Sequence, residues 1–352
     1  MDRRPEPVRY RVAGRSTVLD VARRRALGLD HWPDGTVGTV LRRGRLVSVG
    51  ANGTRLARAE RAVPRWWRRA HPAWDTPFGT VVATAGTVDD VRDTPDYLAG
   101  GPLFYDRDRD LMLLVYHAET HRADDPQRFY ATLGLAASSD GGATFRDLGR
   151  IVRPEIAPTE AARIARPVEV GPGSLVALDD RFVVVFHDFR PDGRRVNLAA
   201  ASADRTEVLD AAARGRSVRW AKFDGTGFSE PALGGRAEEL MPMDRPFNGI
   251  EWSAAAPVDD GWILVGSTSY FGVWSLTVSR TTDGVSWSAP TVVNGSRSDD
   301  EGLYVSASAP LTAEERAEAG PGGLLVHRVL SATGGYGRWD DARLERLVLR
   351  PD

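Results

Sequence analysis

The feature that most constrains the fold is a pattern of short alternating strands that recurs along the sequence. Its clearest copy runs from Gly100 to Gly149, where apolar stretches such as LMLLVYH and FYATLGLAA predict three or four antiparallel strands joined by polar turns. Turn residues followed by an apolar strand recur at spacings of roughly 70 to 80 residues, at Tyr105-Asp106, Asp179-Asp180 and Asp259-Asp260. A repeat of this length indicates a propeller or another repeat array.

We predict an all-β fold, a five-bladed β-propeller of four-stranded antiparallel blades with short helical inserts. In this interpretation residues 1–352 form one domain, and residues 1–33 are an N-terminal arm. The blades span roughly 34–90, 91–155, 164–235, 247–295 and 300–350. The alternative fold is a two-sheet sandwich with insertions.

Segments between and before the blades predict the remaining elements. Val8 to Gly14 alternates and is expected to close the ring by pairing with the last blade. Short helices are expected within Thr17–Asp30 and Arg205–Gly215. A third is expected after Thr312, because Glu315 follows at the spacing of a capping box.

Composition bounds the partners and the compartment. The net charge is −2, and no apolar run approaches the roughly 20 residues that cross a bilayer, so neither nucleic acid nor a membrane is an expected partner. The basic segment Arg65–Arg69 (RWWRR) is interpreted as an inter-strand link with packed tryptophans. The N-terminus has no apolar stretch, so we expect no signal peptide on the chain as given and a cytoplasmic location.

One turn carries a local motif of known propellers. SSDGGATF resembles the Asp-box of sialidase-like propellers at Ser138, Asp140, Gly142, Thr144 and Phe145. Looser copies are RTTDGVSW (Arg280 to Trp287) and FDGTGFSEP (Phe223 to Pro231). The aspartate of such a turn caps backbone amides and a glycine takes positive φ, so the motif is structural.

The number of units extends this resemblance. The chain has no Arg-Ile-Pro segment, which a sialidase would carry near its N-terminus. With five units it is more similar to the arabinanase, xylosidase and fructosidase group of inverting or retaining glycoside hydrolases.

An acidic residue precedes the first strand of every predicted unit, where a propeller's inner strands open into the axial funnel. These residues are Asp34, Asp96, Glu169, Glu251 and Asp300 or Glu301. Glycoside hydrolysis needs two carboxyl groups across the scissile bond. The resemblance implies Asp34 as the base, Asp96 as a modulator and Glu169 as the acid. Glu251 competes for the acid role, because the neighbouring indole of Trp252 would raise a carboxyl pKa.

Further side chains are expected to bind the substrate. Aromatic rings near the acidic positions can stack on sugar faces or pack between blades; they are His31, Trp32, Tyr97, Trp252 and Tyr304. Polar pairs end the second strands of neighbouring units, near the funnel or at its rim; they are His117 with Glu119 and His187 with Asp188. Arg166 is expected to bind a carboxylate or to orient the acid.

No cofactor and no metal is expected. His117 and His121 have a helical metal-binding spacing but fall in a strand and a turn, and the chain has no cysteine. The sequence also has no Walker loop, dinucleotide fingerprint or Gly-x-Ser-x-Gly elbow.

The predicted function is a glycoside hydrolase that cleaves a furanoside-type or related glycan by carboxylate acid–base catalysis in the axial funnel. Two alternatives stay open. One is an intracellular propeller enzyme of small-molecule biosynthesis, a cyclase, lyase or isomerase that uses the same acid–base pocket. The other is a non-catalytic propeller that binds a glycan or a protein.

Overall fold

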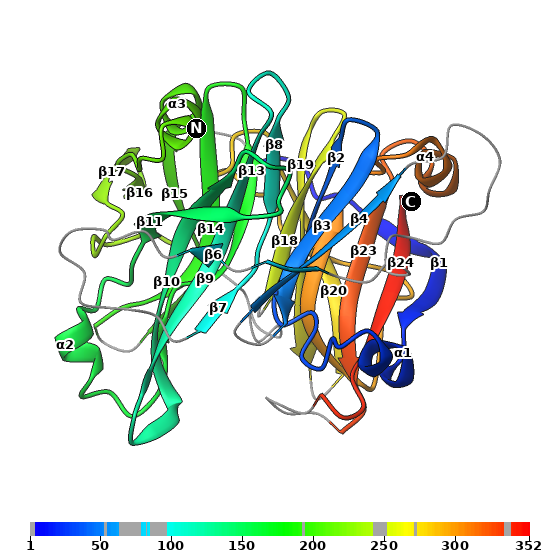
Figure 1. The fold of residues 1–352 in the computed structure, drawn as a ribbon, viewed down its shortest axis with the longest axis horizontal. Coiled ribbons are helices and arrows are strands. Elements are labelled where there is room, and N and C mark those ends of the chain that lie inside the picture. The colour runs from blue at the N-terminus through cyan, green and yellow to red at the C-terminus, as the bar shows by residue number, and fades with distance from the viewer. Residues whose placement is uncertain are drawn as a thin grey trace.

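The structure is a computed structural model that describes residues 4–52, 55–62, 79–81, 83–84, 97–191, 194–241, 252–270, 273–333 and 339–352. These residues form a five-bladed β-propeller of five mostly antiparallel sheets, and Figure 1 shows the sheets packed side by side. The predicted fold class is confirmed, and the two-sheet sandwich is wrong. None of the described helices is long and apolar enough to span a membrane.

The first sheet contains β2 (Gly38–Arg42), β3 (Arg45–Asn52), β4 (Arg55–Ala62) and β5 (Gly79–Val81). The second contains β6 (Ala83–Thr84), β7 (Tyr97–Ala99), β8 (Leu103–Asp106), β9 (Leu111–Arg122), β10 (Asp125–Ser138), β11 (Phe145–Val152) and β12 (Val168–Glu169). The third contains β13 (Gly171–Ala177), β14 (Arg181–Phe189), β15 (Arg195–Asp204), β16 (Ala221–Phe223) and β17 (Phe228–Pro231).

The fourth sheet contains β18 (Trp252–Val258), β19 (Gly261–Tyr270), β20 (Val273–Thr281) and β21 (Thr291–Val292). The fifth contains β22 (Glu301–Ser308), β23 (Leu324–Ser331), β24 (Arg343–Pro351) and the N-terminal strand β1 (Tyr10–Leu19). Because β1 pairs antiparallel with β24, both ends of the chain lie in one sheet. The division of residues 1–352 into one domain with the blade bounds given above stays a prediction.

Short helices lie between the strands, and three of the described helices begin at side-chain caps. In α1 (Val21–Ala26) the side chain of Asp20 accepts from the amide of Arg23, and in α3 (Arg205–Ala213) Asp204 accepts from Glu207. The expected capping box of Thr312 and Glu315 is present at α4 (Ala313–Ala319). A further short helix, α2 (Pro158–Ala161), was not expected from the sequence.

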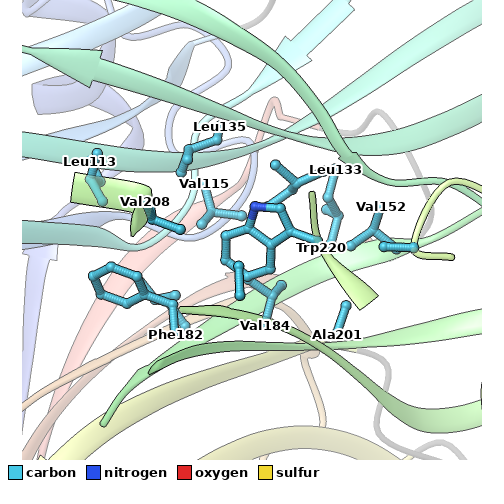
Figure 2. Packing of buried hydrophobic residues seen from close by; sticks show 14 of the residues in the cluster. Leu113, Val115, Leu133, Leu135, Val152, Phe182, Val184, Ala201, Val208 and Trp220 are labelled. Carbon is cyan, nitrogen blue, oxygen red and sulfur yellow. The ribbon is translucent and has the colours of Figure 1, made fainter. Parts of the chain in front are cut away.

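The core lies between neighbouring sheets, and β9 explains why its sequence reads as one apolar run. Alternate residues of a strand face opposite sides of the sheet. Leu113 and Val115 pack with Phe182 and Val184 of the third sheet, in the cluster that Figure 2 shows around Trp220. Their neighbours Met112, Leu114 and Tyr116 pack with Val47 and Val49 of the first sheet. A strand covered on both faces needs apolar residues at every position.

The turn between β10 and β11 is held by Asp140. Its carboxylate accepts from the backbone amide of Thr144 at 2.9 Å and from the hydroxyl of Ser138 at 2.8 Å. Gly141 and Gly142 have φ values of 79° and 82°, which favour glycine. The turn is therefore held by local hydrogen bonds, whereas its assignment as an Asp-box stays a prediction.

Candidate active site

Asp34 lies four residues before Gly38, the first residue of β2, which is the innermost strand of the first sheet. Its backbone amide donates to the carbonyl of Ala51 at 3.0 Å. The next residue, Gly35, has a φ of 122°, and a Cβ there would lie 3.0 Å from the carbonyl oxygen of Gly100. A glycine is therefore required where the chain turns from Asp34 into β2, close to the backbone of the second sheet.

Two tyrosine hydroxyls from different sheets bind the Asp34 carboxyl group. Tyr97 of β7 donates to Oδ2 of Asp34, and Tyr304 of β22 is the second hydrogen-bonding partner. Tyr304 has a φ of 27° at a register shift between Leu303 and Val305. A bulge of this kind re-aims a side chain, and positive φ is strained for a tyrosine. The strained bulge brings Tyr304 to Asp34.

Burial raises the pKa of Asp34, although the hydrogen bonds from Tyr304 and Tyr97 act in the opposite direction. The same burial, together with the nearby Asp34 carboxyl, raises the pKa of Tyr97 well above its ordinary value. Asp34 is therefore a carboxyl group whose neutral form is favoured by its surroundings.

An aromatic group flanks Asp34 on the side of the fifth sheet. The ring of Trp339 stacks on Tyr304, with centroids 6.0 Å apart and planes at 7°. His31 approaches Trp339 edge-on at 6.2 Å, and the Arg24 guanidinium lies 5.6 Å from the centre of that ring. Sequence reasoning missed Trp339; its only signal was a tryptophan in the polar segment before the last strand.

A second acidic group gathers around Glu169 of β12. Its Oε1 lies 3.3 Å from Nε2 of His187, and its Oε2 lies 3.9 Å from Nε2 of His117. The two histidines come from β14 and β9, the middle strands of neighbouring sheets. A Cβ at Gly171 would lie 3.3 Å from Nε2 of His117, so this glycine lets the chain pass close over the histidine ring.

The other ring nitrogen of His117 faces a second glutamate, Glu119. Nδ1 of His117 lies 3.4 Å from Oε1 of Glu119, and Nε2 of His121 lies 3.1 Å from Oε2 of the same carboxylate. On the other side of the cluster, Arg195 reaches Nδ1 of His187 at 3.0 Å. Glu169, His117 and Glu119 therefore alternate along one chain of contacts.

The charges of this second group differ from those around Asp34. Burial opposes the charge on Glu169, but His187, His117 and Arg195 outweigh it and lower the pKa of Glu169 to about 2. Burial lowers the pKa of His117 to about 4, although Glu169 acts against this shift. Glu169 is therefore held as the carboxylate anion, whereas the surroundings of Asp34 favour the neutral acid.

Strand register connects the two groups. Tyr97 of β7 lies opposite Glu119 of β9, which lies opposite Ala131 of β10, and Ala131 in turn lies opposite Glu169 of β12. Three steps between adjacent strands put about 14 Å between the Cα atoms of Tyr97 and Glu169. The ring of Tyr97 also meets His121 edge-on at 6.4 Å. Asp34, Glu119 and Glu169 are thus linked by contacts between neighbouring strands: Tyr97 joins Asp34 to Glu119, and His117 joins Glu119 to Glu169.

Two predicted substrate-binding residues lie elsewhere. Trp32 is 1% exposed and packs in the core with Leu29 and Val37, which agrees with the alternative that this ring packs between the blades. Asp188 is 2% exposed, and its carboxylate lies 2.6 Å from Nζ of Lys222. Asp188 is therefore partnered by Lys222, whereas its neighbour His187 meets Glu169.

The remaining predicted residues are placed only in part. Asp96 and Glu251 lie outside the described residues. Trp252 begins β18, and only its backbone is described. Arg166 is exposed and lies 5.1 Å from the centre of the Phe189 ring. Glu301 is half-buried and begins β22.

No group of three or more histidine, aspartate and glutamate side chains is arranged to hold a metal ion within the described ranges. The carboxylates and histidines listed above instead contact one another or neighbouring tyrosine and arginine side chains.

Comparison with known proteins gives a fold but no sequence family. No protein-family model and no curated protein matches the sequence. Among solved structures, an α-L-arabinofuranosidase from Podospora anserina in complex with cellotriose matches with a TM-score of 0.52 at 10% identity, over 98% of each chain. The catalytic domain of a GH62 α-L-arabinofuranosidase from Coprinopsis cinerea matches with a TM-score of 0.51 at 11% identity, again over 98% of each chain.

A glycosyl hydrolase from Bacteroides ovatus matches with a TM-score of 0.53 at 12% identity, over 89% of this chain and 83% of that one. This chain has the fold of the five-bladed propeller glycoside hydrolases. At identities of 10–12% the similarity establishes the fold alone, so any reaction must be argued from the site.

Proposed function

We propose that this chain is a glycoside hydrolase that cleaves a furanoside or a related glycan by acid–base catalysis. One observation carries the proposal: two half-buried carboxyl groups, linked through contacts between neighbouring strands, have pKa values shifted in opposite directions. The pKa of Asp34 is raised by burial, and the pKa of Glu169 is lowered to about 2 against the effect of its burial. Environments that push two pKa values apart assign an acid and a base.

The directions of these shifts favour roles that are the reverse of those the resemblance implies. A general acid must carry a proton, and a base or nucleophile must have lost it. In our proposal Asp34 therefore protonates the leaving oxygen, and the carboxylate of Glu169 activates water or attacks the anomeric carbon. Glu251 remains the rival for the proton-donor role, because it precedes the inner strand β18 in the sequence.

The contacts of the two carboxyl groups favour catalysis over a purely structural role. Asp34 accepts from tyrosine, and Glu169 lies against histidine, so both carboxyl groups contact side chains that can themselves exchange protons. The stacked pair of Tyr304 and Trp339 offers an aromatic surface beside Asp34. We take the proposed substrate class from the proteins of similar fold, two of which are described as arabinofuranosidases.

The test uses aryl glycosides whose leaving groups differ in acidity. The panel contains α-L-arabinofuranosides, β-D-fructofuranosides, β-D-xylosides and β-mannosides. The β-mannosides are included because a further protein of similar fold, with a TM-score of 0.51 and 10% identity, is described as targeting β-1,2 mannosidic linkages. The variants are Asp34→Asn, Glu169→Gln and Glu251→Gln. The control is Asp259→Asn, an exposed carboxyl in the turn between β18 and β19.

A variant of the proton donor keeps its activity on dinitrophenyl glycosides, because so acidic a leaving group departs without a proton. A variant of the base or nucleophile loses activity on every substrate. We expect Asp34→Asn to keep its activity on dinitrophenyl glycosides and Glu169→Gln to lose activity on every substrate. If Glu251→Gln keeps its activity on dinitrophenyl glycosides instead, Glu251 is the proton donor. Hydrolysis of no panel member, or full activity in all three variants, contradicts the proposal.

A further inference from the structure

A cavity of about 400 Å³ lies on the axis of the propeller, apart from the candidate active site. All five innermost strands contribute to its wall: β2, β8, β13, β18 and β22. The cavity is lined by residues near the C-terminal ends of these strands, such as Leu41, Ala177 and Ser308. Asp34 and Glu169, in contrast, lie before the first residues of their inner strands. None of the site residues Asp34, Tyr97 or Glu169 lines it.

The described wall of the cavity is mostly apolar and carries no charged side chain. Its described lining contains no aspartate, glutamate, lysine, arginine or histidine. The lining contains large apolar side chains, among them Leu103, Phe104 and Trp262, and several alanines, among them Ala177, Ala255 and Ala307. Leu41 is 38% exposed, which marks an apolar opening toward solvent.

Most hydroxyl groups in this wall already serve the protein. Thr36 donates to the carbonyl of Val305 at 3.1 Å, and Ser174 donates to that of Ser253 at 2.9 Å. Thr39 shares a hydrogen bond of 2.9 Å with Ser48, and Tyr105 donates to Asp110 at 2.8 Å. A sugar placed here would lose its water without gaining equivalent partners, which costs free energy at every hydroxyl.

We infer that this axial cavity is a second binding site, for a small, uncharged and largely apolar molecule. Its volume lies within the range of about 300 to 1,000 Å³ that small-molecule pockets occupy. Apolar cavities bind apolar ligands, since such ligands bury surface without leaving polar groups unpaired. The ligand class therefore differs from the polyhydroxylated substrate of the candidate active site.

Nile red, an uncharged apolar dye that fluoresces in apolar surroundings, is the probe. We expect one saturable dye site per chain. Ala255→Phe fills the cavity and weakens dye binding at least tenfold, whereas Ala143→Phe, in the exposed turn between β10 and β11, leaves it unchanged. Asp34→Asn also leaves dye binding unchanged, because Asp34 does not line the cavity.

A smaller substitution, Ala307→Leu, repeats the test if Ala255→Phe does not fold by circular dichroism and thermal unfolding. Dye binding that survives the folded cavity-filling variant overturns the inference, and so does dye binding that Asp34→Asn abolishes. Sedimentation velocity tests the remaining explanation. A dimer that the cavity-filling variant dissociates would mean that a second copy of the chain covers the opening, and would also overturn the inference.

Discussion

Arg195 donates from Nη2 to Nδ1 of His187 across 3.0 Å, and this one contact determines the tautomer of the histidine. A guanidinium has donors but no acceptor, so Nδ1 must be the unprotonated nitrogen. The ring proton of neutral His187 is then on Nε2, which lies 3.3 Å from Oε1 of Glu169. Arg195 therefore acts on Glu169 both through its charge and through the orientation of His187.

Replacing Arg195 with methionine is expected to raise the pKa of Glu169, because the variant loses a positive charge and the fixed N–H of His187. If ionised Glu169 is the active form, activity is lost below its pKa, so the acid limb of the pH–rate profile moves to higher pH. Nitrogen NMR of His187 should show one neutral tautomer in the parent and a mixture in Arg195→Met. The control is Arg181→Met, which removes an arginine from an exposed ion pair with Asp180. An unchanged His187 spectrum in Arg195→Met contradicts the tautomer assignment.

Replacing Tyr97 with phenylalanine is expected to raise the pKa of Asp34 further, because its hydroxyl stabilises the carboxylate form. If Asp34 donates the proton, the basic limb of the profile moves to higher pH. Tyr10→Phe, which removes a hydroxyl bound to Gly322, is the matched control. If the acid limb of the pH–rate profile moves in Tyr97→Phe instead of the basic limb, Asp34 acts as the base.

The ion pair of Lys222 and Asp188 is expected to stabilise the fold without serving catalysis. Lys222 is fully buried, and Lys222→Met leaves Asp188 buried without its cation, which costs about 3 to 5 kcal/mol of unfolding free energy. Urea denaturation measures the loss. Arg181→Ala, which breaks an exposed pair, is expected to cost at most about 1 kcal/mol. A folded Lys222→Met with a greatly reduced kcat would contradict the structural role.

The two tryptophans of this region are expected to behave differently. Trp32→Ala leaves a cavity in the core and is expected to cost about 3 to 5 kcal/mol of stability. Trp339 is only half-buried, and Trp339→Ala removes the ring stacked on Tyr304, so we expect a higher KM with a smaller loss of stability. Thermal unfolding and steady-state kinetics separate the two effects. A Trp339→Ala variant with an unchanged KM would contradict the role of this ring in the site.

Local sequence patterns predicted the elements well, for reasons that lie in the backbone. The turns at Asp106, Asp180 and Asp260 separate apolar strands, and the capping box at Thr312 begins α4, because turn and cap chemistry acts over a few residues. The apolar stretch LMLLVYH was correctly predicted to be a strand, β9. The short helix α2 escaped prediction, since its only cue was a proline at its first residue.

The site was predicted less completely, because side-chain direction depends on register and packing. Asp34, Tyr97 and Tyr304 were proposed separately, and only a bulge at Tyr304 brings that residue to Asp34. Trp32 and Asp188 stand beside site residues in the chain, yet one is a core residue and the other faces Lys222. Arg195 and Trp339 were not predicted, since each reaches the site through contacts with residues distant in the chain or on another strand.

The sequence by itself determined that this chain forms repeated antiparallel sheets with acidic residues ahead of the inner strands, since strand periodicity and turn chemistry are local properties. Only the tertiary structure decided which acidic residue would be surrounded by tyrosines and which by histidines. That difference sets the protonation of Asp34 and Glu169, because the pKa of a buried carboxyl depends on neighbours that the fold, and not the chain order, brings within a few ångströms.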